Sequence, residues 1–414
     1  MRKSVIHGSY AILFGSFVLG CSAGAGAVGG TGEDTTSGES SSSTGSAQGA
    51  GGAGAASTGT FIDPSTGGNV VSTCMAGPED DFDMDGFTIT AGDCNDCDAN
   101  ANPGAIEVGP DDAMGMGGYQ AADEDCDGEV DNVAPPCDAS LALEGTDAMD
   151  GARAIELCKV SADGSWGVVS GQWVRANGSA SSASLHNGIL DGFGANVPPR
   201  AGGRVLAISS GTARDASDAG YVNHSYQGVG AGVAPPGFPQ DVPNCTGATD
   251  IHDDVGLDLS IKAPTNATGY TFDFKFYSNE FPEFVCTDFN DQFIALVNPA
   301  PMGAINGNIS FDSMNNPVSV NIAFFDVCQV NPAYPQFTCP LGTGELQGTG
   351  FANAEGGTGW LQTSAPIEGG ATFSLRFAIW DTGDQSWDST TIIDNFKWIA
   401  NGGTVDVGTI DVPE

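Results

Sequence analysis

The densest group of side chains that could bind a metal ion lies between residues 79 and 131. This segment contains seventeen Asp or Glu residues and no Lys or Arg. Its first part, Asp81-Phe-Asp83-Met-Asp85-Gly86, places a carboxylate at every second residue and then a glycine. Alternate side chains of such a loop converge on one point while the glycine takes a sharp turn, as in the first half of an EF-hand loop. The pattern predicts a site for a hard cation.

The match to an EF-hand stops at that glycine. Counting Asp81 as position 1, position 12 is Gly92, where an EF-hand has its bidentate Glu, and no helical pattern flanks the loop. We therefore expect a cation-binding loop segment pinned by cysteines. Its predicted ligands are Asp81, Asp83, Asp85, Asp93, Asp96, Asp98, Glu107, Asp125, Asp127 and Asp131.

The donor chemistry predicts Ca²⁺ as the bound ion. All of these donors are hard oxygens, and so many uncompensated negative charges would repel one another in a compact segment without cations. Two alternatives stay open. An acidic run can be merely solvated, and Met84, Met114 and Met116 leave room for copper, although the segment has no histidine.

The acidic segment resembles a known family of repeats. The stretches Asp-x-Asp-x-Asp-Gly, Gly-Asp-Cys-Asn-Asp, Asn-Pro-Gly-Ala-x-Glu and Asp-Cys-Asp-Gly-x-Val-Asp follow one another between Cys74 and Cys137. They resemble, in the same order, the MopE-type metal-binding repeat of bacterial surface proteins, which is similar in style to thrombospondin type 3 repeats. This chain departs from the family in Cys97 and in a longer insert over Pro110–Ala122, so the last acidic block need not join the first.

A second group of acids lies far along the chain. Glu280, Asp291, Asp381, Asp384 and Asp388 form a candidate second Ca²⁺ site, because few basic residues are available to balance them. Glu280, Glu283, Asp288 and Asp291 could instead include a glycosidase pair, and turn chemistry is the third explanation. With no Gly-x-Ser-x-Gly elbow and no zinc or phosphate motif, we predict no enzymatic activity.

The elements that would position these acids are mostly strands. Short runs such as Trp166–Val169, Arg204–Ile208, Tyr270–Tyr277 and Phe373–Ile379 are separated by Gly, Asn and Pro. Strict alternation from Tyr270 predicts one buried and one solvent-facing side. One helix is expected over Thr146–Val160, capped by Thr146. The fold class is mainly β, an antiparallel, jelly-roll-like β-sandwich.

Two blocks of the strand-rich part resemble a second family. They are Phe274-Lys-Phe-Tyr-Ser-Asn-Glu-Phe-Pro-Glu-Phe-Val285 with the following Phe289-Asn-Asp-Gln-Phe293, and Phe377-Ala-Ile-Trp-Asp-Thr-Gly-Asp-Gln-Ser-Trp387 with Asp394-Asn-Phe396. Both are similar to the choice-of-anchor L domain, over about Asp150 to Ala400. That family occurs on exported bacterial proteins with varied surface anchors and has no established activity. The loops Val233–Val242 and Cys328–Cys339 are expected insertions.

The start of the chain predicts export and a lipid anchor. Arg2 and Lys3 precede an apolar run, and Val18-Leu-Gly-Cys21 resembles a lipoprotein signal with Cys21 as the lipidated residue. Ser22 favours the outer membrane. Ten further cysteines in an exported chain predict a disulfide framework. Local closure makes Cys328–Cys339 the best single pair.

These features divide the chain into four parts. We expect a signal peptide over 1–20, a Gly/Ala/Ser/Thr-rich flexible tether over 21–72, the acidic module over 73–138, and the sandwich over 139–414. A net charge of −40 argues against nucleic acid as a partner.

The predicted function is that of a calcium-binding lipoprotein on the cell surface. It would be held in the outer membrane through acylated Cys21 and act in adhesion or recognition of a glycan or protein. A polysaccharide hydrolase and a copper-scavenging surface protein are the alternatives.

Overall fold

A computed structural model gives the protein's structure over most of the chain. It describes residues 60–62, 71–73, 77–109, 121–132, 134–143, 145–162, 164–182, 184–223, 225–245, 247–322, 324–351, 355–400 and 402–414. The expected signal peptide, Cys21 and most of the expected tether lie outside these residues. None of the helices in the described part is long and apolar enough to cross a membrane.

Strands dominate the described residues. They are β1 (Thr60–Ile62), β2 (Val71–Thr73), β3 (Gly167–Val174), β4 (Asn187–Leu190), β5 (Val205–Ser209), β6 (Ile251–Lys262), β7 (Gly269–Ser278), β8 (Gln292–Asn298), β9 (Val318–Ser319), β10 (Gly356–Gly357), β11 (Leu361–Pro366), β12 (Thr372–Thr382), β13 (Ser389–Ile399) and β14 (Gly408–Asp411). The helical pieces are η1 (Ile89–Ala91), α1 (Ala148–Arg153) and η2 (Gly344–Leu346). The predicted strand-rich fold is confirmed.

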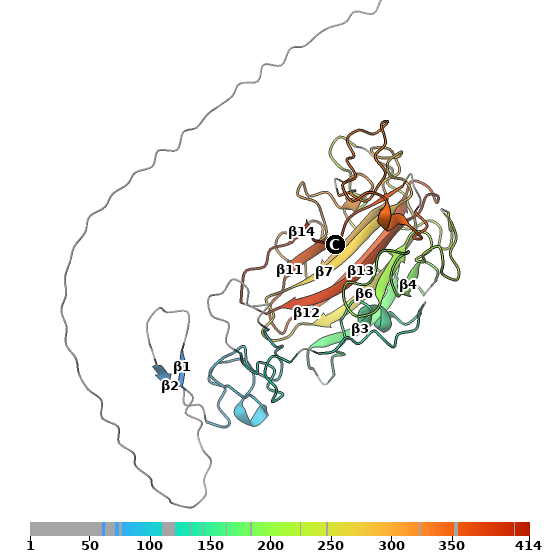
Figure 1. Ribbon diagram of the computed structural model, residues 1–414. Helices are drawn as coiled ribbons and strands as arrows, with labels where there is room; N and C mark the ends of the chain where they lie inside the picture. Colours follow the sequence, from blue (N-terminus) through green and yellow to red (C-terminus); the bar gives the residue numbers. More distant parts are fainter. Residues whose placement is uncertain are drawn as a thin grey trace, which may run out of the picture. The chain divides into compact units, whose positions relative to one another are not determined.

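Two antiparallel sheets form the sandwich (Figure 1). The first has the order β14-β11-β7-β13-β5-β4, with β10 added to β7, and the second has the order β3-β6-β12-β8-β9. In the first sheet Ser389 pairs with Ser278, and in the second Trp380 pairs with Gln292. Strands β1 and β2 pair separately and lie in the range predicted as a tether, except for Thr73, which begins the predicted acidic module; Thr, Ile and Val favour strands.

The main core consists of aromatic and branched side chains between the two sheets. Phe272, Phe274 and Phe276 of β7 lie on this inner side, together with Phe293 of β8 and Phe377 of β12. Their rings make edge-on and stacked contacts with centroids 5.0–6.4 Å apart, which stabilises the packing beyond simple area burial.

The prediction that one side of β7 faces solvent is wrong. Asp273, Lys275 and Tyr277, which alternate with the core phenylalanines, are all fully buried. Side chains around Phe193 and Phe351 form a second apolar cluster against Tyr277 and cover this outer face. Alternation reveals two faces of a strand, but it does not show what loops from elsewhere in the chain will cover.

The predicted helix is also shorter than expected. It spans only Ala148–Arg153, and its N-cap is Asp147, whose side chain accepts a hydrogen bond from the Met149 N–H, so Thr146 is not the cap. The backbone of Glu156 has φ +72°, which a helix cannot accommodate. Cys158 is then tied back to Cys137 by a disulfide.

Four disulfides join described cysteines. They are Cys94–Cys126, Cys137–Cys158, Cys245–Cys286 and Cys328–Cys339. The predicted local pair Cys328–Cys339 is confirmed. The Cys137–Cys158 bond crosses the predicted boundary between the acidic module and the sandwich.

The acidic module is hydrogen-bonded to the turn between β6 and β7. The Asn266 side chain accepts from the Ile106 N–H at 3.1 Å and donates to the Ile106 carbonyl at 2.8 Å. The Thr265 N–H donates to the Gly104 carbonyl, and its hydroxyl donates to the Asn102 side chain. The Asn-Pro-Gly-Ala-x-Glu stretch is therefore the part of the module that holds it against the sandwich.

Candidate metal sites

The first acidic loop is shaped by its own carboxylates. Asp81 accepts a hydrogen bond from the Gly86 N–H at 3.1 Å, Asp83 from the Asp85 N–H at 3.3 Å, and Asp85 from the Phe87 N–H at 2.7 Å. Gly86 has φ +96°, so the sharp turn predicted at this glycine is present. Asp81, Asp83 and Asp85 come close enough together to ligate one ion.

Further carboxylates complete this first group. Asp93 and Asp96, on the segment after η1, lie with Asp83 in a second trio of the same kind. Both are buried, with exposed fractions of 4% and 3%. Asp96 accepts from the Phe82 N–H at 2.7 Å and Asp93 from the Asn95 N–H at 2.7 Å, so each uses one oxygen to hold the backbone.

The second oxygens of several of these acids face inward without a donor. Oδ2 of Asp83, of Asp85 and of Asp93 is buried and accepts no hydrogen bond. Burial, followed by the charge of Asp85, raises the pKa of Asp83 to about 6. Burial likewise raises the pKa of Asp85 and that of Asp93, against the opposing effect of their backbone hydrogen bonds. A cation at this point would satisfy these oxygens and offset the repulsion.

A second loop repeats the first in sequence and geometry. Asp123-Glu-Asp125-Cys-Asp127-Gly128 has the same Asp-x-Asp-x-Asp-Gly pattern. The Gly128 N–H donates to Asp123 at 3.0 Å, the Asp127 N–H to Asp125 at 3.2 Å and the Glu129 N–H to Asp127 at 2.8 Å. Gly128 has φ +96°, the same value as Gly86. The two loops are two copies of one turn, joined by the Cys94–Cys126 disulfide.

The structure divides the predicted ligands between these two loops. Glu107 belongs to the second, where it forms trios with Asp123 and Asp125 and with Glu124 and Asp131. Its carboxylate accepts from the Asp125 and Asp131 N–H groups. Burial is the largest cause of the raised pKa of Glu107 and of Glu124.

Some ligand predictions need adjusting. Asp123 and Glu124 were missed, although Asp123 opens a second Asp-x-Asp-x-Asp-Gly pattern that the sequence displays. Asp98 is exposed and holds Asn100, and Asp127 is exposed and holds Asn132, which lowers the pKa of Asp127. Met84 of the copper hypothesis is 87% exposed, and Met114 and Met116 lie outside the described residues.

The second predicted group of acids lies at one end of the sandwich. Glu280 follows β7 and Asp388 precedes β13, two paired strands of the first sheet. Asp291 precedes β8 and Asp381 lies near the end of β12, two paired strands of the second sheet. All four are buried, with exposed fractions between 0% and 4%. We call Glu280, Asp291, Asp381 and Asp388 the buried carboxylate centre.

Hydrogen bonds connect this centre to both sheets. Asp291 accepts from the Thr382 N–H at 3.0 Å and from the Ser389 hydroxyl at 2.6 Å. Asp388 accepts from the Tyr226 N–H at 3.1 Å. The candidate residue Asp384 is only partly buried and accepts from the Ser386 N–H, but its charge acts on both Glu280 and Asp291, so it lies at the edge of the centre.

Burial raises the pKa of every member of the centre. It is the largest cause of a pKa of about 7 for Asp291 and for Asp388. The pKa values of Glu280 and Asp381 are raised well above their ordinary values, first by burial and then by the charge of Asp291. The glycosidase hypothesis drew a pair from Glu280, Glu283, Asp288 and Asp291. Glu283 and Asp288 are exposed, whereas Glu280 and Asp291 are both members of the centre.

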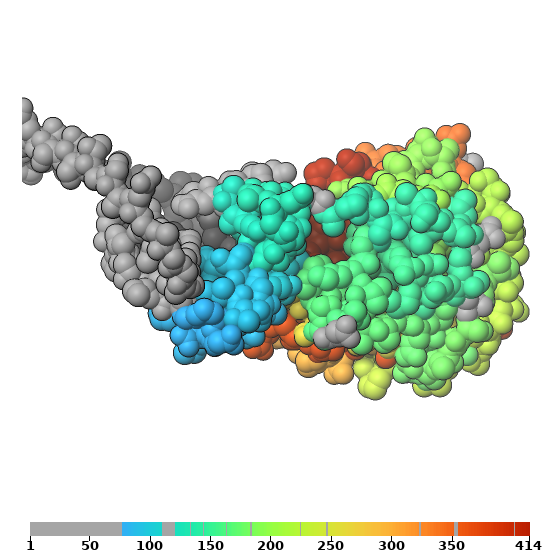
Figure 2. Space-filling model, turned by 90° about the horizontal axis from the view of Figure 1, so that it is seen from below, coloured from blue at the N-terminus to red at the C-terminus, as the bar shows by residue number. Residues whose placement is uncertain are grey.

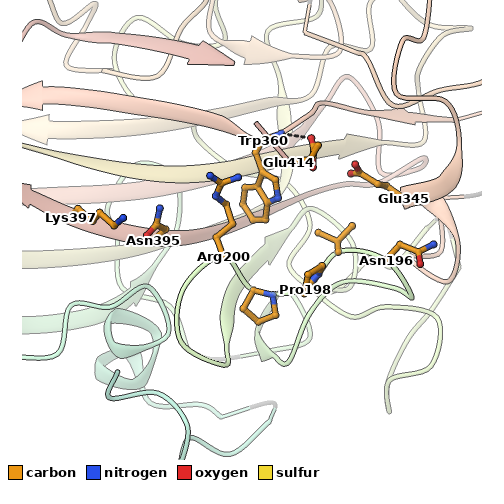
Figure 3. Close-up of a pocket in the computed structure, with 10 residues that line it drawn as sticks. Asn196, Pro198, Arg200, Glu345, Trp360, Asn395, Lys397 and Glu414 are labelled. Carbon is orange, nitrogen blue, oxygen red and sulfur yellow. Dashed lines mark hydrogen bonds between the residues drawn. The ribbon is translucent and has the colours of Figure 1, made fainter. Parts of the chain in front are cut away.

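A separate cavity of about 460 Å³ opens on the outer side of the first sheet (Figure 3). Its lining residues are Asn196, Val197, Pro198, Pro199, Arg200, Glu345, Trp360, Asn395, Lys397 and Glu414. Arg200 pairs with Asp273 at 2.7 Å and lies over the Trp360 ring. Lys275, buried behind the cavity, is bound by Glu345 and Glu414. Trp360 and Asn395 are buried, with exposed fractions of 4% and 7%, so the partly exposed Arg200 is the most accessible of these three groups.

Comparison with known proteins supports part of this description. Residues 210–396 match the family model described as Choice-of-anchor L domain, and this domain indicates a cell-surface protein. No curated protein matches the chain. The enzymatically active domain of tailspike protein 4 from bacteriophage CBA120 is a similar solved structure at 7% identity, covering 54% of this chain and 19% of that one. Its TM-score of 0.18 supports no argument about fold or activity.

Proposed function

We propose that this cell-surface protein binds Ca²⁺ through its acidic module and acts in adhesion or recognition. The observation that carries the proposal is the pair of matching acidic loops. In both, every aspartate accepts at least one hydrogen bond from a backbone N–H, and in the first loop the second oxygens of Asp83 and Asp85 are buried without donors. Seven or so hard oxygens at one point are what Ca²⁺ prefers.

The bound ion would stabilise the shape of the module. The buried apolar side chains of residues 77–109 and 121–132 are Ala101 and Ala105, far too little to form a hydrophobic core. The blue surface in Figure 2 belongs to the first of these ranges. With so little apolar burial, the free energy that orders the loops must come from the disulfide, the contacts with Thr265 and Asn266, and cation binding.

The rest of the proposal concerns place and partner. Lipidation at Cys21 would tether the chain to the outer membrane, with residues 21–72 as the spacer. We propose that a glycan or protein ligand binds at the cavity lined by Arg200, Glu345 and Lys397, because charged and polar side chains around a hollow suit both kinds of ligand.

The test is calcium-dependent protection of the module in the full chain. Hydrogen exchange over residues 77–109 should slow in millimolar Ca²⁺ relative to excess chelator, and Mg²⁺ should have a much smaller effect because it needs a tighter octahedral cage. Free Ca²⁺ at a hundredfold excess over its dissociation constant would stabilise the folded module by about 2.7 kcal/mol.

A paired variant identifies the ligands. Asp83→Asn with Asp93→Asn should remove the calcium effect on exchange in this segment. Glu129→Gln, an exposed acid of the same module, is the matched control and should retain it. Equal protection with and without Ca²⁺ in the unmodified chain would show that the acidic segment is a solvated spacer and end the proposal.

A further inference from the structure

The buried carboxylate centre occupies a position where the two sheets would otherwise be closed by apolar side chains. Inward-facing Phe276 of β7 and Phe293 of β8 belong to the main core, and the centre lies directly beyond these strands at their shared end. Asp291 is bonded to Thr382 of the second sheet and to Ser389 of the first. A charged group therefore bridges the layers at this end of the sandwich.

The centre lacks the donors that its oxygens require. Both oxygens of Asp381, Oε2 of Glu280, Oδ1 of Asp388 and the side-chain oxygen of Asn279 are buried and accept no hydrogen bond. These side chains are at least nine-tenths buried. A buried carboxylate normally accepts two or more hydrogen bonds, because desolvation without compensation is costly. The unmet oxygens belong to side chains from both sheets.

Basic side chains do not supply the missing charge. The strongest charged influences on Glu280, Asp291 and Asp381 are other carboxylates. Among the described residues, the nearest-in-sequence cations are engaged elsewhere: Lys275 binds Glu345 and Glu414, and Arg376 binds Asp258. Lys275 and Arg376 therefore do not neutralise the centre. Arg214, which lines a small pocket together with Asn279 and Asp388, donates to the backbone carbonyls of Asn187 and Ala213.

We propose that Glu280, Asp291 and Asp381 hold one divalent cation, Ca²⁺ by the chemistry of the donors, that joins the two sheets. The donors are all hard oxygens, and Asn279 adds a neutral amide oxygen of the kind common in Ca²⁺ sites. Asp388 lies beside these residues and contributes negative charge to the site. This site is independent of the acidic module and can exist whether or not that module binds an ion.

Protons are the competing explanation. The carboxyl groups of Asp291 and Asp381 are close enough to share one proton. That proton would serve only this pair, however, and would leave Oε2 of Glu280 and the side-chain oxygen of Asn279 without a partner. A cation meets all of these groups at once. The two explanations predict opposite effects when one carboxylate becomes an amide.

A tryptophan that neighbours the centre in sequence can report ion binding by fluorescence. Trp387 immediately precedes Asp388, is 44% exposed and has φ +71°, and its ring lies 6.0 Å from that of Phe284. Because Tb³⁺ replaces Ca²⁺ in oxygen sites and is excited by a nearby indole, ion binding at the centre should produce sensitised Tb³⁺ emission. Trp387→Phe should lower that emission without removing the ion, and the remaining emission should come from Trp380, which is fully buried and immediately precedes Asp381.

The experiment counts and locates ions in the full chain. We would compare the unmodified chain with Asp381→Asn and with Glu280→Gln. Tb³⁺ emission during titration, with and without competing Ca²⁺, measures binding at the centre. Native mass spectrometry counts the bound ions. We expect each substitution to remove one ion and to weaken sensitised binding at least tenfold. Asp288→Asn, an exposed acid near the same loop, is the control and should leave both unchanged. The module variant Asp83→Asn with Asp93→Asn should retain the sensitised site.

The direction in which the thermal unfolding midpoint changes distinguishes the two explanations. If the cation is bound, Asp381→Asn lowers the midpoint in Ca²⁺ and leaves it equal or higher in chelator. If protons alone neutralise the centre, the same variant raises the midpoint in both solutions at pH 8 and the ion count is unchanged, which overturns the proposal. Should Asp381→Asn not fold, Glu280→Gln provides the same comparison. If the unmodified chain binds this ion but none in the acidic module, that result would contradict only the proposed function.

Discussion

The acidic module and the buried carboxylate centre use the same side chains in opposite ways. In the module, carboxylates such as Asp83 and Asp125 determine the backbone, because each binds an N–H two residues ahead and so creates the turn. In the centre, the strands determine where Glu280 and Asp381 lie, and neither makes a comparable local turn. The first arrangement builds a site where there is little hydrophobic core. The second places carboxylates at the end of a hydrophobic core that the strands already form.

This difference teaches what to expect when charge is removed. Loss of a module carboxylate should open a loop while the sandwich remains folded. Loss of a central carboxylate should change the stability of the whole sandwich, since desolvation makes each uncompensated charge costly. The predictions below test this contrast in order of decreasing effect.

The largest effect is expected where a buried charge already has partners. Lys275 is fully buried and bound by Glu345 and Glu414. Lys275→Met should destabilise the sandwich by about 3–5 kcal/mol, because the partly buried Glu345 and the exposed Glu414 both lose the cation that pairs with them. Denaturant unfolding measures this loss of stability. The control is Lys397→Met, at an exposed position on the neighbouring strand, which should change the stability by close to zero. A loss below about 1 kcal/mol would mean that burial of charge is cheap here, and would weaken the case that the centre needs an ion.

The next effect should be confined to the module. Replacing Cys94 and Cys126 by Ser removes the cross-link between the two acidic loops, and such losses cost about 2–4 kcal/mol. We expect faster hydrogen exchange over residues 77–109 and a lower affinity for Ca²⁺, with the unfolding midpoint of the sandwich unchanged. Replacing Cys328 and Cys339, a sandwich pair, should do the reverse. An equal fall of the sandwich midpoint in both variants would show that the module is part of the sandwich's cooperative unit.

Much of this contrast could be predicted from the sequence, since local patterns determine local structure. Alternate aspartates before Gly86 identified the first turn, and the alternation from Tyr270 identified β7. The acids of the centre were predicted as one group because few basic residues were available to balance them. The sequence separation of Glu280 and Asp381 does not show that they meet, because that depends on how the strands pair across the sandwich.

The errors have a common physical cause. The outer face of β7 was expected to contact solvent, but Phe193 and Phe351 come from distant loops to cover it. The helix from Thr146 was expected to continue to Val160, but the Cys137–Cys158 bond and the backbone of Glu156 end it early. Long-range packing and cross-links are not encoded in a local pattern. Asp123 was a different kind of error, because its repeat was visible in the sequence.

The two acidic loops themselves can be compared by glycine substitution. Gly86 and Gly128 share φ +96°, and a methyl group added to either would contact nothing. Gly86→Ala and Gly128→Ala should therefore cost only backbone strain, about 1–2 kcal/mol each, and weaken Ca²⁺ binding by similar factors. Gly203→Ala, which has equal space and no positive φ, is the control. Calorimetric titration of each variant measures the effect, and unequal losses would show that only one loop binds the ion.

The smallest effect concerns Glu156, a carboxylate whose burial is intermediate between that of the exposed module acids and that of the buried carboxylate centre. Its Oε1 is buried without a donor, and Asp138 lies nearby. Burial, followed by the charge of Asp138, raises the pKa of Glu156 to about 7. The nearby Asp394 also has a raised pKa of about 7, first through its own burial and in part through Glu156.

The sign of the pH effect follows from proton uptake. Because the folded chain holds the Glu156 proton more tightly than the unfolded chain, stability falls as pH rises from about 4.5 to 7, and the full cost persists above 7. Glu156→Gln removes that cost, so the variant should be more stable than the unmodified chain at pH 8 by about 1 kcal/mol, after allowance for solvent screening, and equal to it at pH 4. Denaturant unfolding of both chains in chelator across this range isolates the difference from the other acids. If the difference in stability between Glu156→Gln and the unmodified chain is the same at all pH values, Glu156 acts through packing. A half-buried carboxylate would then carry no electrostatic cost comparable to that of the buried carboxylate centre.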